Sequence, residues 1–445
     1  MTSLALSMIV RDAAGLLPQC LESVRGVVQE MVIADTGSRD DSKEIALAFG
    51  ARVIQIPWHN DFAEARNLCL DSVHSDWVLS LDADELLDPT AAGKLAPLLA
   101  NSSITAYQVT IRNFVRSLQD RIWDRPAIPN DSPLPSGKPF PAYVDHQNVR
   151  LFRNEKSIRF VGRVHESVGP SLLKQKRAIA HADFLIYHFG LAAASEDRAA
   201  KNIFYRELGR QKLLEMPTDA QAHLELGLVE MDNFANLDEA LHLFARACQL
   251  NPRLGPAWFF QGLVLVRLQK FSEGLKRLAT AESLGHRTAL VAEIRGDAFY
   301  NLGSFRQSVN CYQTALHREP ASPGLISKLG LALVRSGNPL PGLRHLHLAI
   351  AQHPQAAELH DRKMLALFSL GDIPGAAQAL ESKLLHILHP AASDYLRAAS
   401  LWSKAANLAQ ASLLIARGLQ LFPEDKKLLI ARDELSPISS SLIFR

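Results

Sequence analysis

Trp77-Val-Leu-Ser-Leu-Asp82-Ala-Asp84-Glu85 is a short apolar run that ends in three acidic residues. Similar runs occur earlier in the chain, and segments with helical spacing separate them. The predicted strands are Leu4–Val10, Met31–Ala34, Val53–Ile56 and Trp77–Leu81, and the predicted helices are Ala14–Val28, Ser42–Phe49 and Phe62–Val73. This alternation predicts a mostly parallel sheet covered on both faces. Ligands bind beyond the carboxyl ends of the strands in such sheets, and Asp35 and Asp82 lie at such ends.

Asp82 and Asp84 form a D-x-D pattern, so one strand delivers two carboxylates to the edge of the sheet. Oxygen ligands of this kind suit Mg²⁺ or Mn²⁺, which can also bind phosphates. A metal there would neutralise the charge that builds on a departing diphosphate. The pattern alone is weak evidence, because the ends of strands are often acidic and solvated.

Residues 104–190 have a different character, because strands follow one another with a proline-rich stretch between them. Predicted strands surround Val109, Ile111 and Phe114 and cover Val149–Phe152, Ile158–Val164 and Phe184–Phe189. Residues 126–141 hold six prolines, so they form neither a regular helix nor an inner strand. These prolines lie within a longer segment, about 115–147. That segment is either a surface insertion or a loop over an acceptor site, and we favour the insertion.

From about residue 196 the strand patterns disappear and a 34-residue repeat begins. Small residues at fixed positions let paired helices pack closely, a glycine serves the turn inside each pair, and a proline closes each unit. The recurring residues include Gly262, Gly296 and Gly330, then Ala281, Ala315 and Ala349, then Gly303, Gly337 and Gly371. The pattern resembles the tetratricopeptide repeat. It predicts about six units over residues 219–436, preceded by a linking helix at 195–218.

The first 194 residues carry further motifs in a fixed order. They are Ser7-Met-Ile-Val-Arg-Asp12, Val32-Ile-Ala-Asp35-Thr-Gly-Ser-Arg-Asp40, Trp58-His-Asn-Asp61-Phe-Ala-Glu-Ala-Arg66-Asn67 and the Asp82 segment, then Val149–Arg153, Gly162–Glu166 and Tyr187–Gly190. In this order they resemble family 2 glycosyltransferases of the GT-A fold, especially bacterial ones fused to tetratricopeptide repeats. The resemblance implies an α/β GT-A (nucleotide-diphospho-sugar transferase) domain, residues 1–194, before an all-α tetratricopeptide-like solenoid.

The resemblance also implies a role for each matched side chain. Asp35 would hydrogen-bond the base of a nucleotide, and Asp61 and Arg66 would lie near the base and the diphosphate. Asp82 would contact the ribose or a metal, and Asp84 would coordinate Mg²⁺ or Mn²⁺ directly. Without the resemblance, Asp35 is equally well a turn carboxylate and Arg66 a residue on a helix surface.

Two residues compete for the role of general base. Family 2 enzymes invert the anomeric centre, so one base must take the proton of the acceptor. The family places a carboxylate well beyond the D-x-D motif, and Glu166 fits because it lies 82 residues after Asp84. His165 is the competing candidate, because histidine exchanges protons near neutral pH. Both are otherwise surface residues of a polar turn, and His188 is either a third metal or diphosphate ligand or a strand-end histidine.

Composition excludes several classes of protein. The chain has 445 residues, with 48 Lys and Arg against 46 Asp and Glu, and this balance argues against nucleic-acid binding. Its cysteines form no C-x-x-C pair, which fits a reducing cytosol; they are Cys20, Cys69, Cys248 and Cys311. No signal peptide or transmembrane segment is predicted. We expect a cytoplasmic protein, with peripheral attachment to the inner face of the membrane left open.

The resemblance, together with these patterns, implies a metal-dependent, inverting glycosyltransferase that moves a sugar from a nucleotide-sugar donor to an acceptor. A UDP-sugar is the favoured donor. The repeats would bind a protein, peptide or glycan acceptor, a partner protein or a second copy of the chain. The alternative is a tetratricopeptide scaffold whose glycosyltransferase-like domain is inactive.

Overall fold

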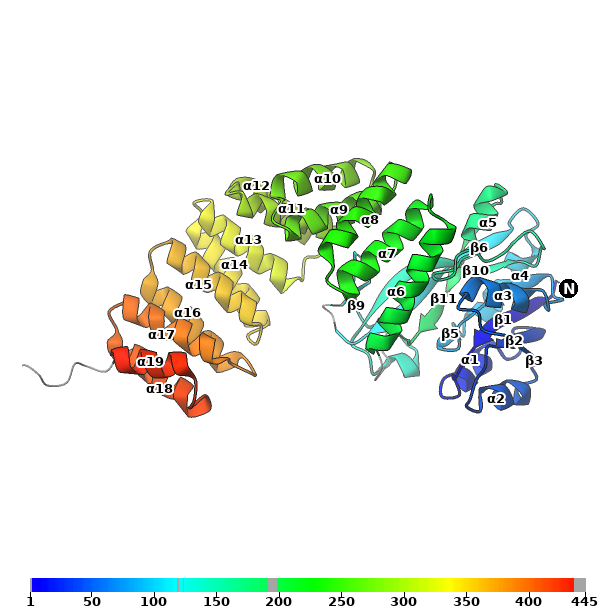
Figure 1. Ribbon diagram of the computed structural model, residues 1–445, viewed down its shortest axis with the longest axis horizontal. Helices are drawn as coiled ribbons and strands as arrows, with labels where there is room; N and C mark the ends of the chain where they lie inside the picture. Colours follow the sequence, from blue (N-terminus) through cyan, green and yellow to red (C-terminus); the bar gives the residue numbers. More distant parts are fainter. Residues whose placement is uncertain (1, 118–119, 123, 191–197, 436–445) are drawn as a thin grey trace, which may run out of the picture. The chain divides into compact units, whose positions relative to one another are not determined.

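The computed structural model describes residues 2–117, 120–122, 124–190 and 198–435. The chain divides into two compact units, Met1–Asn251 and Pro252–Arg445 (Figure 1). The first unit holds the sheet together with three of the long helices that follow it. The boundary between compact units therefore lies beyond the first predicted repeat.

The sheet of the first unit has a parallel half, formed by β1 to β4, and a mixed half, formed by β5, β6, β10 and β11. Its strand order is β3-β2-β1-β4-β10-β6-β11-β5, and β9 pairs with β10. β1, β2, β3 and β4 are parallel, so their carboxyl ends meet at one edge, whereas β10 runs antiparallel to both β4 and β6. The strands are β1 Leu4–Val10, β2 Glu30–Asp35, β3 Arg52–Gln55, β4 Trp77–Ser80, β5 Glu85–Leu87, β6 Ala106–Val115, β7 Arg121–Ile122, β8 Arg125–Pro126, β9 Ile128–Pro129, β10 Ala142–Arg153 and β11 Ile179–His188.

Both faces of the sheet are covered, because successive side chains of a strand point to opposite faces. In β1, Leu4, Leu6 and Met8 pack in one hydrophobic cluster with α1 and α4, while Ala5 packs in another with α3 and α5. The helices of this layer are α1 Leu17–Val24, α2 Ser42–Ala48, α3 Phe62–Leu70, α4 Ala91–Ala100 and α5 Gly169–Lys174. The α/β prediction for this part of the chain is confirmed.

One local prediction was wrong. Residues 158–164 are not a strand: they lie in a loop with one isolated bridge, Val161 to Ser167. Their apolar side chains, including Ile158 and Phe160, are buried against the sheet and α3 instead of pairing. The N-cap position of α4 is Thr90, and the Asp88 carboxylate accepts from the backbone N–H of Thr90.

The proline-rich segment forms short pieces with no regular helix or inner strand, as its prolines require. β9 adds to β10, and a single 3-10 turn covers Pro135–Gly137. The side chain of Asn130 holds the segment together by donating to the carbonyl oxygens of Gly137 and Phe140.

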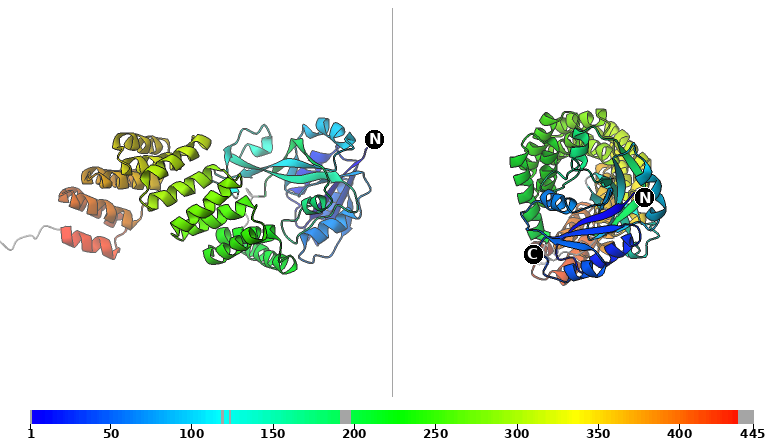
Figure 2. Two further views of the ribbon diagram at one scale, coloured as in Figure 1. Left: turned by 90° about the horizontal axis from the view of Figure 1, so that it is seen from above. Right: turned by 90° about the vertical axis from the view of Figure 1, so that its right-hand side faces the viewer.

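Helical pairs make up the rest of the described chain. They are α6 Arg198–Glu215, α7 Ala220–Asn233, α8 Leu237–Leu250, α9 Gly255–Arg267, α10 Phe271–Ser283, α11 Ala289–Asn301, α12 Phe305–Arg318, α13 Pro323–Arg335, α14 Pro339–Gln352, α15 Ala357–Ser369, α16 Ile373–His386, α17 Ala392–Lys404, α18 Leu408–Leu421 and α19 Lys426–Leu435. In the second unit these pairs stack in succession (Figure 2). The predicted helical solenoid is confirmed.

The glycines of the 34-residue repeat lie where the two helices of a pair cross. A Cβ atom at Gly296 would lie 2.5 Å from the ring of Tyr312, and one at Gly330 would lie 2.8 Å from the carbonyl oxygen of Gly342. Close packing of the pairs therefore requires the absence of a side chain. The turn glycines adopt positive φ, which favours glycine; they are Gly303, Gly337 and Gly371.

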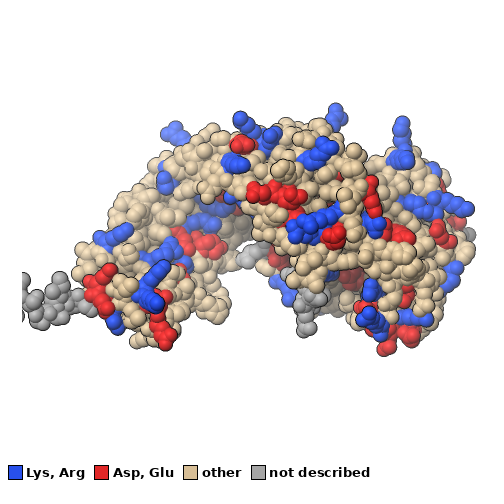
Figure 3. Space-filling model, in the orientation of Figure 1, with Lys and Arg blue, Asp and Glu red and all other residues tan. Residues whose placement is uncertain are grey.

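The surfaces of both units mix the two signs of charge. Lysine and arginine side chains lie among aspartate and glutamate on the face shown in Figure 3, in line with their nearly equal totals. In the described part of the chain, no helix combines the length and the apolar character needed to cross a membrane.

Candidate active site

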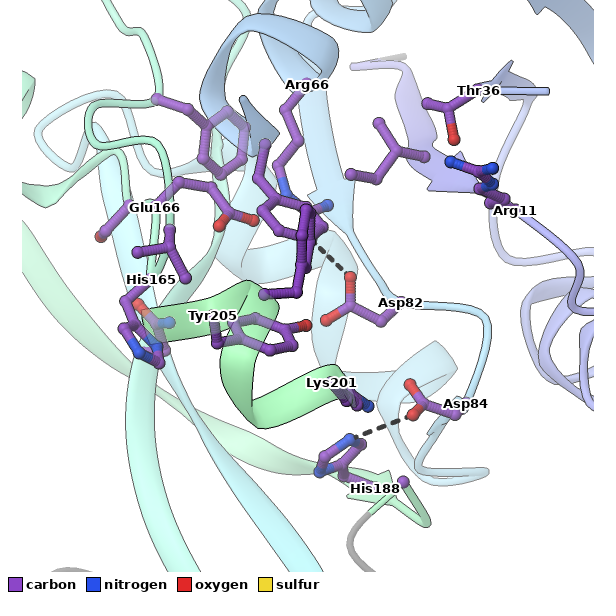
Figure 4. Close-up of a pocket in the computed structure, with 18 of the residues that line it drawn as sticks. Arg11, Thr36, Arg66, Asp82, Asp84, His165, Glu166, His188, Lys201 and Tyr205 are labelled. Carbon is purple, nitrogen blue, oxygen red and sulfur yellow. Dashed lines mark hydrogen bonds and ion pairs between the residues drawn. The ribbon is translucent and has the colours of Figure 1, made fainter. Parts of the chain in front are cut away.

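A pocket of about 910 Å³ lies at the carboxyl ends of the parallel strands (Figure 4). Its wall includes Val10 at the end of β1, Thr36 after β2 and Asp82 after β4. The loop at 160–167, the end of β11 and helices α6 and α7 complete the wall. Six residues predicted for the site line it together: Arg66, Asp82, Asp84, His165, Glu166 and His188.

The guanidinium of Arg66 connects two carboxylates of this pocket. Its Nη2 donates to Oδ1 of Asp82 at 2.5 Å, and its Nε donates to Oε1 of Glu166 at 2.5 Å. The Arg66 side chain is 7% exposed. The alternative that Arg66 is a residue on a helix surface is therefore wrong. One buried cation thus joins the strand-end motif to a loop residue, Glu166, that lies 100 residues after Arg66 in sequence.

A second arginine completes the environment of Asp82. Arg150 on β10 donates to Oδ2 of Asp82 at 3.1 Å and to Oε1 of Glu85 at 2.7 Å. Burial opposes ionisation of Asp82, but Arg66 and Arg150 outweigh it and hold the pKa of this carboxyl far below its usual value. Both oxygens of Asp82 are therefore occupied by guanidinium groups, which leaves them poorly placed to bind a metal.

Glu85 supports the turn that carries the aspartates. It is 1% exposed and accepts the backbone N–H of Asp82 at 2.9 Å. Burial raises the pKa of Glu85 to about 7, although the nearby Arg150 acts in the opposite direction. We assign Glu85 to the structure of the turn.

Asp84 and His188 converge on the same point of the pocket. His188 Nε2 lies 3.3 Å from Oδ2 of Asp84. A Cβ atom at Gly190 would lie 2.2 Å from that oxygen and 2.7 Å from that nitrogen, so only glycine leaves the space open. A carboxylate oxygen and an imidazole nitrogen that share an open space fit a divalent metal.

The ring of His188 is oriented by Asn113 on β6. The amide nitrogen of Asn113 donates to the carbonyl oxygen of Val144 at 2.9 Å and lies 2.7 Å from Nδ1 of His146, which fixes the amide oxygen toward His188. His188 Nδ1 lies 2.8 Å from that oxygen and therefore carries the hydrogen. Nε2 is then directed toward Asp84, an arrangement typical of metal-binding histidines.

The protein supplies only part of a metal coordination shell here. Within the ranges that the structure describes, no group of three or more His, Cys, Asp or Glu side chains is placed to hold an ion. Asp84 and His188 would supply two ligands, and phosphate oxygens and water would complete the shell, as Mg²⁺ commonly requires.

The two candidate bases lie on a loop that α6 holds in place. His165 has φ of 54°, so the backbone turns sharply before Glu166. Lys212 donates to the carbonyl oxygen of Val164 at 2.9 Å and to Glu225 at 2.8 Å. The helical region therefore positions the loop that faces the sheet edge.

Asp35 and Asp61 are not among the residues that line the pocket. Asp35 is 3% exposed and accepts the backbone N–H of Ser38 at 3.1 Å, while its neighbour Thr36 faces the pocket. Asp61 caps α3 by accepting the backbone N–H of Glu64 at 2.9 Å. Both hold turns at the border of the pocket, so a direct contact with a nucleotide remains a prediction.

Residues 7–159 match the family model described as glycosyl transferase family 2. The chain therefore carries a family 2 glycosyltransferase domain. The glycosyltransferase domain contains all of the matched motifs up to Arg153, and the repeats follow it. This confirms the predicted combination of a family 2 domain with C-terminal tetratricopeptide-like repeats.

Curated relatives of this chain are named either for the repeats or for glycosyltransferase activity. A TPR repeat-containing protein of Synechococcus elongatus is 32% identical over 234 residues, which cover 51% of this chain and 52% of that protein. An uncharacterized glycosyltransferase of Rickettsia felis is 30% identical over 119 residues, or 25% of this chain and 40% of that one. The Bacillus subtilis glycosyltransferase SunS is 24% identical over 161 residues, which cover 36% of this chain and 33% of that protein. The chain thus spans about half, or less, of the length of these relatives.

Solved structures of tetratricopeptide repeat proteins are similar to part of the chain. One from Parabacteroides merdae has a TM-score of 0.42 at 13% identity and covers 53% of this chain and 93% of that one. YrrB, described as a TPR protein with an unusual peptide-binding site, has a TM-score of 0.35 at 16% identity. The match covers 40% of this chain and 92% of YrrB.

Sequence reasoning missed three parts of the site. Arg150 lies inside the matched segment Val149–Arg153, so its family motif could have identified it. Asn113 carries no such signal, because its role depends on the register of β6 with β10 and β11. Helix α6 was predicted as a linker, yet Lys201 and Tyr205 line the pocket.

We predict that Arg66→Met destabilises the first unit by about 3 kcal/mol, because it leaves two largely buried carboxylates without their shared cation. Urea denaturation of the full chain, followed by circular dichroism, measures this effect. Arg159→Met is the matched control, since Arg159 pairs with the exposed Asp71 at 2.9 Å. That pair should contribute less than about 1 kcal/mol. Equal effects of the two substitutions would contradict the assigned role of Arg66.

Proposed function

We propose that the protein is a metal-dependent, inverting glycosyltransferase that uses a nucleotide-sugar donor, with a UDP-sugar favoured. The observation that carries this proposal is the convergence of Asp84 and His188 on an open space at the edge of the sheet. The family 2 domain that contains Asp84 supports the reaction class. The pocket, at about 910 Å³, has room for a nucleotide-sugar.

Asp84 and His188 would hold Mg²⁺ or Mn²⁺. When bound, the ion would supply positive charge to the diphosphate as it leaves the sugar. Asp82, which was predicted to bind the ribose or the metal, would instead hold Arg66 and Arg150 in the pocket. The protein would thus contribute positioning and fixed positive charge rather than covalent chemistry.

Glu166 is the better placed of the two candidate bases. Its Oε1 accepts from Arg66, and within the described chain its Oε2 has no hydrogen-bond partner. Oε2 is thus available to take the proton of an acceptor, while the contact with Arg66 fixes the direction of the carboxylate. His165 also faces the pocket but lies on an exposed turn.

The repeats would bind the acceptor, a partner protein or a second copy of the chain. Stacked helix pairs present extended surfaces, and this use rests on the general behaviour of such repeats.

Calorimetric titration with UDP and GDP, with and without Mn²⁺, tests the proposal. We expect one nucleotide to bind only with the metal, and Asp84→Asn to abolish this binding by removing a ligand. Asp183→Asn is the control, because its side chain is 100% exposed and lies outside the pocket. Absence of binding to both nucleotides would contradict the proposal and favour a scaffold with an inactive glycosyltransferase-like domain.

We further predict that Glu166→Gln lowers the turnover of the donor by about 10²–10⁴-fold, because the amide cannot accept the proton. Binding of the nucleotide should persist, since Asp84 and His188 are unchanged. His165→Asn should have a far smaller effect. The rate of release of the nucleoside diphosphate from the preferred donor measures both variants, and the reverse ranking would identify His165 as the base.

A further inference from the structure

One face of α6 runs along the glycosyltransferase domain. Lys201, Tyr205, Leu208 and Lys212 follow one another at intervals of four, three and four residues. Side chains at this spacing lie on the same face of a helix. The N-terminal half of this face lines the pocket, whereas the C-terminal half contacts the loop that carries the candidate bases.

The C-terminal half of the face fixes the helix in place. Lys212 is 5% exposed and donates to the carbonyl oxygen of Val164, and Glu215 accepts from Nε of Arg163 at 2.6 Å. A buried lysine held by a carbonyl oxygen and a carboxylate has little freedom to move. The position of Lys201 relative to the pocket is therefore determined by contacts away from the pocket itself.

Tyr205 forms the middle of the face. Its ring stacks on Phe62, with centroids 6.1 Å apart and planes 8° from parallel. Burial raises the pKa of the Tyr205 hydroxyl, and the charges of Glu166, Asp82 and Asp84 add to this effect. In Figure 4 the Tyr205 hydroxyl points toward Asp82, and the same turn of α6 carries Lys201 to that side of the pocket.

Lys201 lies at the end of the pocket that holds Asp84 and His188, whereas Arg11 and Thr36 lie at the other end (Figure 4). Its Nζ is 5.8 Å from the centroid of the Tyr205 ring. Within the described residues, Lys201 forms no ion pair, although Arg66 and Arg150 are each bound to two carboxylates. Lys201 is thus a pocket cation whose charge no carboxylate of the described chain neutralises.

We propose that Lys201 binds the outer phosphate of a nucleoside diphosphate in this pocket. The inference rests on the proposed function and extends the binding site onto the helical region. An ammonium group beside Asp84 and His188 would complement the charge of the diphosphate that remains after the sugar has left. The first long helix is then part of the binding site as well as a connection to the repeats.

The test compares UDP and UMP, each titrated with Mn²⁺ into the full-length protein and its variants. We expect Lys201→Gln to weaken UDP binding by roughly tenfold to a hundredfold, the size of a lost charge-assisted hydrogen bond. UMP, which lacks the outer phosphate, should lose far less. Lys201→Arg should keep most of the affinity for UDP, because the positive charge remains.

Lys156→Gln is the matched control, since it removes one exposed lysine charge outside the pocket. The thermal midpoints of all variants should equal that of the unmodified protein, because exposed side chains contribute little to stability. UDP binding by Lys201→Gln at the level of the control would overturn the role of Lys201 and leave the proposed function standing. Equal losses for UDP and UMP would also overturn it. If the unmodified protein binds neither nucleotide, both proposals fail together.

Discussion

The ion pairs of Arg66 are the contacts on which the site depends. One guanidinium on α3 joins Asp82, at the end of β4, to Glu166, on a loop that follows β10. Because a buried carboxylate is stable only with a partner, this cation allows two acidic groups to lie close together in one pocket. The remaining carboxylate of the D-x-D motif, Asp84, is left free to converge with His188.

The sheet and the first long helix, α6, both contribute to this site. The sheet supplies the acidic edge, and α6 covers it with Lys201 and Tyr205 while Lys212 secures the loop behind them. The compact unit of residues 1–251 includes α6, α7 and α8, which agrees with this arrangement. The early helices therefore act with the glycosyltransferase domain, and the later pairs form a unit of their own.

Much of the fold could be predicted from the sequence, because local patterns determine it. Alternating apolar runs gave the strands around Leu4–Val10, and the 34-residue spacing of Gly262, Gly296 and Gly330 gave the helix pairs. The loop at 158–164 was mistaken for a strand because its apolar residues bury without pairing. The site was harder to predict, since Asn113 and Lys201 reach it through strand register and helix packing, which no local pattern reveals.

The most direct test of this account is the position of Mn²⁺ in crystals of the protein grown with UDP. Anomalous scattering locates the ion without assumptions about the ligand. The account predicts one strong peak between Oδ2 of Asp84 and Nε2 of His188, with the diphosphate beside it and Asp82 still held by Arg66 and Arg150. An ion bound by Asp82, or a nucleotide outside this pocket, would contradict it.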